Sequence, residues 1–386
     1  MSRAPLWIAL VLVGLFLAID RALPSLVERA LNRVEPHAPW PVGERARALH
    51  AKIPVADLHA DPLLWKRDWL VRSSRGHTDL PRLVEGGVAL QVVTAVSKTP
   101  TSQNYVRNDD STDSLTYLAI AQLWPLPTWT SPLARALHQA EILADLVRRA
   151  DGALRLIRTR DELAALLAER AAGRPAVGVI FGIEGAQALE GDLAKLDLLE
   201  ARGLRIVGLT HFSDNALGGS LHGVSKGGLT EFGRAVVSEA GRRRMIVDVA
   251  HASAKMVEDV LAQGERPVIL SHGGFRGVCD TARNLDDDVM RKIAAHGGLI
   301  GVGYWDGAVC DISPAGVVRA IRYGIDLVGL DHIALGSDYD GTTTVRFDAS
   351  ELAVLTQTML DAGFSEGEIR AVMGENALRF FAAQLP

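Results

Sequence analysis

Cysteine is scarce in this sequence, since Cys279 and Cys310 are the only two among 386 residues. Neither lies in a spacing typical of a metal site, so we exclude both as metal ligands. A disulfide between them requires an oxidising compartment and Cα atoms within about 7 Å of each other. The distance between the two residues in space cannot be read from their positions along the chain. The sequence therefore leaves this bridge open.

An excess of positive charge, internal repeats and low-complexity tracts are also missing. The formal net charge is −5, so the chain offers no broad basic field to a phosphate backbone, which argues against nucleic-acid binding. Apolar residues, in contrast, make up 48% of the chain and are ample for a large core. The length suits one large domain or two ordinary ones.

Long hydrophobic runs are missing except at the N-terminus, where residues 6–19 are all apolar or glycine. This run is shorter than the about 20 residues of a full membrane span and suits the core of an export signal better. No convincing cleavage site follows it. We therefore expect a signal peptide or membrane anchor over 1–22 and a leader segment over 23–50. The protein would then be exported, either periplasmic or attached to a membrane through residues 6–19. The alternative is a buried first helix of the domain.

Eight short apolar segments rich in β-branched residues recur after residue 50, mostly bounded by glycine or proline. Near-continuous apolar runs of this length are typical of parallel strands that are buried on both faces. The eight predicted strands are Pro54–Leu58, Val88–Val96, Ala176–Ile183, Leu204–Thr210, Met245–Ala250, Pro267–Ser271, Gly298–Tyr304 and His332–Ser337.

Helical patterns lie between most of these strands, and several begin at residues that cap helices well. Ser253 is a good N-cap, and Ser313 precedes a proline at the first helical position. Ser365 and Glu368 have the spacing of a capping box. Alternating strands and helices indicate βα units around a parallel sheet. Eight such units predict an α/β fold of the closed (β/α)8 TIM-like barrel type over residues 51–386.

One connection in this barrel is abnormally long, because residues 97–175 separate the second and third predicted strands. It begins with a polar loop over Ser97–Asp113 and continues with helical stretches over Pro132–Ala150 and Asp161–Ala172. Long insertions in barrels usually lie on the catalytic face. We therefore expect this helical insertion to form a lid or a wall of the pocket.

Polar residues cluster where the predicted strands end, which is where such barrels build their active sites. A single histidine after a strand is more often structural than a metal ligand. Several ionisable side chains buried at one rim without a shared purpose would, however, be costly. The residues at these strand ends are His59, Asp61, Glu184, His211, His251, His272, Tyr304 and Asp338.

Four neighbouring polar residues receive a structural interpretation. Asp57 is expected to support its turn, and His332 lies at the opposite end of the last strand. His222 lies in a glycine-rich loop, where it could reach the substrate, but an exposed loop histidine is expected. Asp340 is expected to support Asp338 or the turn before Gly341.

The donor types at the rim suit zinc, which binds neutral imidazoles and carboxylates. His59 and Asp61 are two residues apart, so an extended segment points both to the same side. Three histidines and two carboxylates are too many for one ion with an open position, but they suit two ions about 4 Å apart. Glu184, which lies between the other donors in barrel order, is the natural bridge. A water between two such cations would have its pKa lowered to near or below about 7 and would provide hydroxide.

Several motifs occur in the order typical of one known family. Together they resemble the membrane dipeptidase (renal dipeptidase) family, zinc peptidases of the amidohydrolase superfamily. The matching stretches are Asp57-Leu58-His59-Ala60-Asp61, Gly182-Ile183-Glu184-Gly185, Leu209-Thr210-His211, Gly228-Leu229-Thr230-Glu231-Phe232-Gly233, Asp248-Val249-Ala250-His251, Ser271-His272, Ala282-Arg283-Asn284-Leu285-Asp286-Asp287 and Gly336-Ser337-Asp338-Tyr339-Asp340-Gly341.

The resemblance implies a role for each metal-site residue. His59 and Asp61 would hold one zinc ion, and His251 and His272 would hold the second. Glu184 would bridge the two ions.

It also implies the residues that act on the substrate. Asp338 would be the acid/base group, and His211 would contact the substrate carbonyl and stabilise the oxyanion. Arg283 would bind the free carboxylate of the substrate, since a guanidinium makes bidentate bonds to a carboxylate. Tyr304 is a candidate for the pocket wall.

The function implied is zinc-dependent hydrolysis of the amide bond of small dipeptides with a free C-terminal carboxylate, by a hydroxide that bridges the metals. The segment after Asp61 and the insertion 97–175 depart from the family pattern, so the side chains of the substrate stay open. One alternative is another amidohydrolase, such as an N-acyl amino acid deacylase, a lactonase or a β-lactam hydrolase. Another is a non-catalytic exported binding protein.

Overall fold

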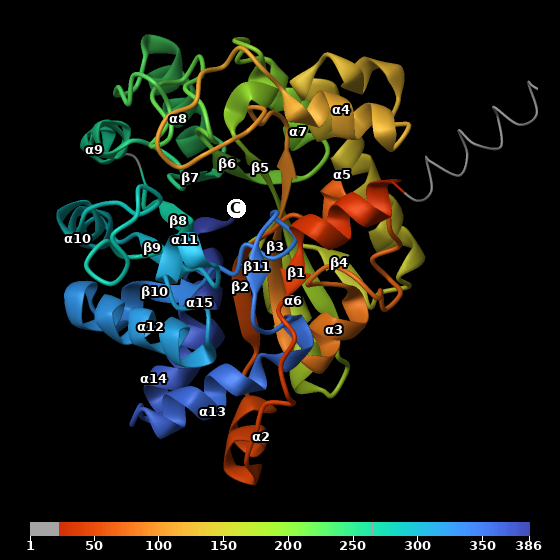
Figure 1. Cartoon of the computed structure of the whole chain (residues 1–386), viewed down its shortest axis with the longest axis vertical. Helices are drawn as coiled ribbons and strands as arrows, with labels where there is room; N and C mark the ends of the chain where they lie inside the picture. The colour runs from red at the N-terminus through yellow and green to blue at the C-terminus, as the bar shows by residue number, and fades with distance from the viewer. Residues whose placement is uncertain (1–22, 265) are drawn as a thin grey trace, which may run out of the picture.

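Eight parallel strands form a closed barrel, which confirms the predicted (β/α)8 fold (Figure 1). The computed structural model describes residues 23–264 and 266–386, so the apolar run at 6–19 lies outside the described residues. The ring closes because β3 pairs with β2 on one side and with β5 on the other. The barrel strands are β2 (Val55–Ala60), β3 (Val88–Val96), β5 (Val177–Glu184), β6 (Leu204–Gly208), β7 (Ile246–Asp248), β8 (Ile269–Gly273), β9 (Leu299–Val302) and β10 (Ile333–Leu335).

Each of these strands overlaps one of the eight predicted segments. Three short strands were not predicted: β1 (Arg33–Val34), β4 (Leu154–Leu156) and β11 (Thr344–Val345). β1 pairs with β11 outside the barrel, and β4 pairs with the start of β5. Their two or three residues are too short to give a periodic pattern.

Apolar side chains fill one end of the barrel and leave the other end to polar groups. Inward-facing residues such as Leu58, Ile180 and Ile246 form a buried cluster of their own. Phe381 and Leu385, at the C-terminus, belong to the same cluster and close this end. A barrel packed in this way is a solid core. Chemistry is therefore confined to the opposite rim.

Helices surround the strands and begin where the caps were predicted (Figure 1). The hydroxyls of Ser253 and Ser313 accept hydrogen bonds from the first turns of α9 and α12, and Ser365 with Glu368 forms the capping box of α14. The helices are α2 (Glu44–His50), α3 (Leu80–Glu85), α4 (Ser114–Ala121), α5 (Pro132–Arg149), α6 (Arg160–Ala171), α7 (Lys195–Glu200), α8 (Glu231–Arg242), α9 (Ala254–Gln263), α10 (Asp287–Ala295), α11 (Asp306–Val309), α12 (Pro314–Val328), α13 (Ala353–Asp361), α14 (Glu366–Arg370) and α15 (Asn376–Gln384).

The long connection at 97–175 divides into two parts with different positions. Its first part, through α4, lines the cavity at the polar rim and includes Thr99, Tyr105 and Leu115. This confirms the expected pocket wall. Its second part, α5 to α6, packs against the outside of the barrel. That part supplies the helical layer between β3 and β5, and only the first part is an insertion on the catalytic face.

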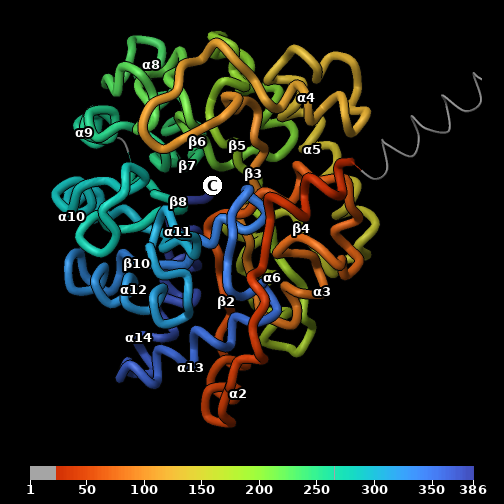
Figure 2. The backbone as a smooth tube through the Cα atoms, in the orientation of Figure 1, coloured from red at the N-terminus to blue at the C-terminus, as the bar shows by residue number. Residues whose placement is uncertain are grey.

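Residues 23–50 pack closely against the barrel. Residues 23–31 are helical, β1 then pairs with β11, and α2 packs on α13. Figure 2 shows this first part of the chain, in red, running beside the blue segment of β11. Among the described residues, no helix combines the length and apolar character required to cross a membrane.

A buried ion-pair network fastens the helical residues 23–31 to the barrel. Glu28 is 1% exposed, and its two carboxylate oxygens lie 2.7 Å from Arg67 Nε and 2.5 Å from Arg75 Nε. Arg67 also pairs with Asp340, which follows β10. The network therefore connects the N-terminal helix to the loop that carries Asp338.

Replacing Glu28 with alanine should destabilise the protein strongly, because it removes one partner of a buried pair and leaves arginine charge uncompensated. The free energy of unfolding should fall by about 3–5 kcal/mol, as measured by denaturant titration. The matched control is Glu35→Ala, which breaks a half-exposed pair with Arg346 and should cost at most about 1 kcal/mol. Equal losses in the two variants would show that Glu28 does not fasten the helix.

Candidate active site and metal centre

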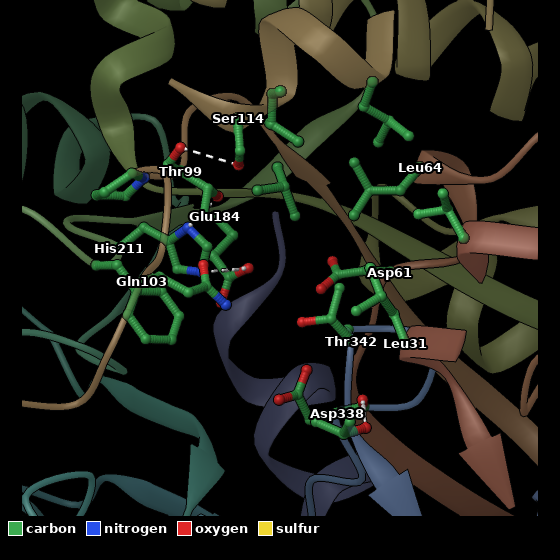
Figure 3. Close-up of a pocket in the computed structure, with 18 of the residues that line it drawn as sticks. Leu31, Asp61, Leu64, Thr99, Gln103, Ser114, Glu184, His211, Asp338 and Thr342 are labelled. Atoms are coloured by element: carbon green, nitrogen blue, oxygen red, sulfur yellow. Dashed lines mark hydrogen bonds and ion pairs between the residues drawn. The ribbon is translucent and has the colours of Figure 1, made fainter. Parts of the chain in front are cut away.

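Imidazole and carboxylate groups from separate strand ends converge at the polar rim of the barrel (Figure 3). Glu184, at the end of β5, is central: its Oε1 lies 3.1 Å from His251 Nε2, 3.3 Å from His272 Nε2 and 3.6 Å from His59 Nε2. Its other oxygen, Oε2, lies 3.3 Å from His211 Nε2. Four imidazoles from four other strand ends thus meet around one carboxylate.

Two further carboxylates complete the cluster on the His59 side. Asp61 Oδ2 lies 3.4 Å and Asp338 Oδ1 3.8 Å from His59 Nε2. Three sets of potential ligand atoms result, each within 4.8 Å of one another, and all their side chains are buried: His59 with Glu184 and His272, Glu184 with His211 and His251, and His59 with Asp61 and Asp338.

Irregular backbone directs several of these side chains into the cluster. The pairing register shifts between Asp57 and Ala60 in β2, and again between Leu270 and Gly273 in β8. Such bulges re-aim the side chains that follow them. His59 and His272 lie within these two shifts, so both rings reach the barrel interior although strict alternation would direct them elsewhere.

His251 and Asp338 have positive φ values of 61° and 57°, which residues other than glycine rarely adopt. Strained backbone of this kind concentrates at functional sites, where the surrounding structure maintains it. The close approach of Gly341 supports this turn, because a Cβ atom there would lie 2.0 Å from Asp338 Oδ1.

Two buried aspartates hold the irregular strand ends in place. Asp57 Oδ1 accepts the backbone N–H groups of His59 and Ser337, which connects β2 to the end of β10. Asp248 Oδ1 accepts those of Ala250 and Ser271, which connects β7 to β8. The sequence indicated a supporting role for Asp57 but none for Asp248.

Hydroxyl groups next to the cluster orient the side chains that could bind metal. Thr94 donates to Asp61 Oδ1, and Ser271 Oγ lies 2.8 Å from His272 Nδ1 and 3.4 Å from His59 Nδ1. Partners of this kind set the orientation and tautomer of metal-binding side chains. No role was predicted for Thr94, and Ser271 was identified only as part of the Ser271-His272 motif, since a hydroxyl inside a strand carries no distinctive sequence signal.

Burial and neighbouring charges raise the pKa values of His59, Asp338 and Glu184 and lower that of His211. Burial acts to lower the pKa of His59, but the carboxylates of Asp61 and Glu184 outweigh it and raise that pKa to about 10. Burial raises the pKa of Asp338 to about 8 although His59 opposes it, and burial with Asp61 raises that of Glu184 well above its ordinary value. Burial lowers the pKa of His211 to about 4.

The donor set fits divalent cations. The Nε2 atoms of His251 and His272 lie 2.9 Å apart, and both face Glu184 Oε1. Burial and the neighbouring cations keep the pKa values of both rings well below the ordinary value, so both are neutral. Neutral imidazole nitrogens and carboxylate oxygens that converge on one point are the ligands that zinc and similar ions select.

Arg283 lies in the same cavity and is 3% exposed. Its Nη2 donates to the carbonyl oxygen of His272 at 2.9 Å, and its guanidinium lies 5.3 Å from the centre of the Trp305 ring. In the part of the chain that the structure describes, no carboxylate lies within ion-pair distance of this guanidinium. A buried cation without a partner carboxylate is costly unless a bound anion pairs with it.

A disulfide between Cys279 and Cys310, with Cα atoms 5.4 Å apart, closes the loop that carries Arg283. Asn284 Nδ2 donates to the carbonyls of Cys279 and Ala308, each at 2.9 Å. The bridge that the sequence left open therefore joins the Arg283 loop to the segment after Trp305.

The structure differs from the expectations for Tyr304, His222 and Asp340. Tyr304 does not line the cavity but packs against Tyr339 and Phe347, and the neighbouring Trp305 lines the cavity instead. His222 is fully buried rather than exposed, because it stacks on Phe212.

Asp340 does not contact Asp338. It pairs with Arg67 and accepts the backbone N–H of His77 at 2.6 Å and the Thr78 hydroxyl at 2.7 Å. The imidazole of His332 lies at the far end of the strand, with its Nδ1 2.8 Å from the carbonyl oxygen of Gly298, as expected of a structural residue.

The cavity above the cluster has a volume of about 590 Å³, within the range of small-molecule sites. Polar and charged side chains form its floor: Asp61, Glu184, His211, His251, Arg283 and Asp338.

Comparison with known proteins agrees with this geometry. The family model described as membrane dipeptidase (peptidase family M19) matches residues 43–385. Dipeptidase verJ of Clonostachys rogersoniana is 29% identical over 351 residues, which cover 87% of this chain and 85% of the relative. Dipeptidase 3 of Mus musculus is 30% identical over 362 residues, which cover 88% of this chain and 66% of the relative.

Solved structures give the same result. The dipeptidase AC, a metallopeptidase of family M19, is 26% identical with a TM-score of 0.72, and the match covers 86% of this chain and 99% of that one. A metallopeptidase from Rhodobacter sphaeroides, bound to a phosphinate mimic of the dipeptide L-Ala-D-Ala, is 26% identical with a TM-score of 0.71, with the same coverage. The chain therefore belongs to the membrane dipeptidase family, peptidase family M19, and is a metallo-dipeptidase on a (β/α)8 barrel.

Proposed function

We propose that this protein is a dinuclear zinc dipeptidase that hydrolyses dipeptides with a free C-terminal carboxylate. The observation that carries the proposal is the buried guanidinium of Arg283, which has no carboxylate partner among the described residues, beside a buried cage of imidazole and carboxylate donors. The cage can hold the metal ions of a hydrolytic centre. The guanidinium can bind an anionic group of the substrate.

In this proposal, His59 and Asp61 would hold one cation, His251 and His272 would hold the other, and Glu184 would contribute to both. Divalent cations at these donors supply Lewis acidity, which lowers the pKa of water and stabilises negative charge near the scissile bond. The support for Glu184 as the shared ligand is that its Oε1 faces histidines of both sets at 3.1–3.6 Å.

Asp338 is proposed to move the proton. Its carboxyl faces the cavity, and burial raises its pKa to about 8, so it can hold a proton near neutral pH. A group with a pKa near the working pH serves well as both acid and base. It would take a proton from the attacking water and deliver it to the leaving amine.

His211 is proposed to hydrogen-bond the carbonyl oxygen of the substrate. Burial lowers its pKa to about 4, so the ring is neutral and carries one proton. Nε2 can donate that proton only in the tautomer in which Nδ1 accepts, and Nε2 lies 3.3 Å from the acceptor Glu184 Oε2. In that tautomer Nδ1 would accept from the Thr99 hydroxyl at 3.3 Å, whereas the Lys98 carbonyl oxygen, also 3.3 Å from Nδ1, would accept from it in the other tautomer.

Zinc loading of the metal-free protein at pH 7 should release at least about one proton per chain, because His59 must lose its proton to become a ligand. The release should decline as the pH rises through about 10, the pKa of His59. Calorimetry in buffers of different ionisation enthalpy measures it, with metal analysis for the ratio of two ions per chain. His59→Ala should reduce the release and His332→Ala should not. Unchanged release in His59→Ala would exclude His59 as a ligand.

Asp338→Asn should lower kcat by about 10²–10⁴, the range for lost acid–base catalysis, and should leave the bound zinc near two per chain. Steady-state kinetics on a dipeptide and metal analysis of the same sample measure both quantities. Asp331→Asn removes an exposed carboxylate before β10 and should leave kcat unchanged. Near-normal turnover in Asp338→Asn would refute the proposed role.

Arg283→Ala should lower kcat/KM for a free dipeptide by about 10–100-fold, the value of a charge-assisted hydrogen bond of about 1.5–3 kcal/mol. The same dipeptide with an amidated C-terminus should be a poor substrate of both enzymes and should lose little further. Arg276→Ala, on the same loop but paired with Asp286, is the matched control. Equal losses on the two substrates would argue against a carboxylate contact.

A further inference from the structure

The catalytic cavity has a wall that is almost entirely apolar and that the mechanism does not use. We name as the apolar wall the six residues Val27, Leu31, Leu64, Trp65, Leu115 and Leu118. They come from the helical residues 23–31, the segment after β2, and α4. Several of them form a hydrophobic cluster that is separate from the barrel core.

The apolar wall lies across the barrel mouth from Arg283. In the ring of strands, β3 and β8 are four steps apart in either direction, so they lie opposite each other. Arg283 follows β8, whereas Leu64 follows β2 and Leu115 follows β3. Figure 3 shows Leu31 and Leu64 on the same side as Asp61, across the cavity from His211.

This arrangement determines which half of the substrate meets the wall. If Arg283 holds the C-terminal carboxylate and the scissile amide lies over the metal cluster, the acyl half points away from Arg283. The acyl half is the part that supplies the scissile carbonyl. It would therefore enter the space in front of the apolar wall.

The wall offers apolar surface to a ligand and no charged group of its own. Among the described residues that line the cavity, the carboxylates are Asp61, Glu184 and Asp338, and all three belong to the catalytic cluster. The wall itself offers no further carboxylate to a protonated amine. Leu31 is 43% exposed, so apolar surface stays in contact with water until a ligand covers it, which favours an apolar ligand.

The N-terminal helix is held in place to serve as part of this wall. Val27 and Leu31 precede and follow Glu28, whose buried pairs with Arg67 and Arg75 fix the helix at the rim. The helix therefore forms a fixed surface of the cavity.

We propose that the apolar wall is the acyl-half subsite and that the enzyme prefers amides whose acyl half is large and apolar. The group is either a bulky aliphatic or aromatic side chain in a dipeptide or the acyl chain of an N-acyl amino acid. The proposal rests on the proposed function, because Arg283 must hold the carboxylate for the acyl half to reach the wall.

The test is a substrate series that keeps glycine as the leaving half, measured with the zinc-loaded full-length protein. One arm lengthens an acyl chain from acetyl through butanoyl and hexanoyl to octanoyl. The other arm compares Gly-Gly with Ala-Gly, Leu-Gly and Phe-Gly. In at least one arm kcat/KM should rise about fourfold per added methylene, until the ligand covers the wall. This factor corresponds to about 0.8 kcal/mol per buried methylene, at about 1.4 kcal/mol per tenfold change. The arm that rises identifies the kind of acyl half.

Variants on one helix separate the wall from general effects. Val27→Gln should reduce the preference for the largest over the smallest substrate by about tenfold. Leu26→Gln lies on the same helix, is 62% exposed in the native protein and does not line the cavity. It should leave the preference unchanged, and thermal unfolding checks that both variants fold.

The outcomes distinguish the two proposals. Hydrolysis with equal kcat/KM across both arms would overturn the apolar subsite while the proposed function stands. A rise that persists unchanged in Val27→Gln would also overturn the assignment to this wall. No hydrolysis of any member, with two zinc ions bound, would instead refute the proposed function.

Discussion

The crowding of three carboxylates and four imidazoles in one buried cluster is the constraint on which the rest of the structure depends. In a low-dielectric interior, these groups are costly unless opposite charge compensates them. The pKa values of His59 and Glu184 reflect this crowding, because the carboxylates of Asp61 and Glu184 outweigh burial and raise that of His59 to about 10, whereas burial and Asp61 raise that of Glu184. Divalent cations would remove the conflict, because each donor then faces a positive charge. The fold therefore has to hold these groups close together.

The barrel does so by irregular backbone that buried hydrogen bonds maintain. His59 and His272 lie at register shifts, and His251 has a left-handed conformation. Each departure from regular geometry costs free energy. Asp57 and Asp248 offset that cost, because each connects two neighbouring strand ends through backbone N–H groups. Burial of apolar side chains at the other end of the barrel stabilises the fold and offsets the free-energy cost of this strained site.

The segments outside the barrel determine the shape of the cavity rather than its chemistry. The first part of the 97–175 connection and the helical residues 23–31 both reach the rim. Glu28 anchors the helix through buried arginines, and the Cys279–Cys310 bridge closes the loop of Arg283 on the other side. Because the catalytic residues and the cavity walls come from different segments, the walls can vary and select different substrates while the reaction stays the same.

The sequence by itself determined the barrel and the types of donor at its rim. Eight apolar runs identify the strands because parallel strands are buried on both faces, and residues such as Glu184 follow directly from their ends. Only the tertiary structure decided which way each side chain points. Strict alternation from Leu58 would turn His59 outward, and a bulge reverses it. Likewise, Tyr304 and Trp305 are neighbours in sequence, but packing directs only Trp305 into the cavity. Hydrophobic periodicity reports burial, whereas orientation, the disulfide and the apolar wall depend on contacts between residues that are far apart in the chain.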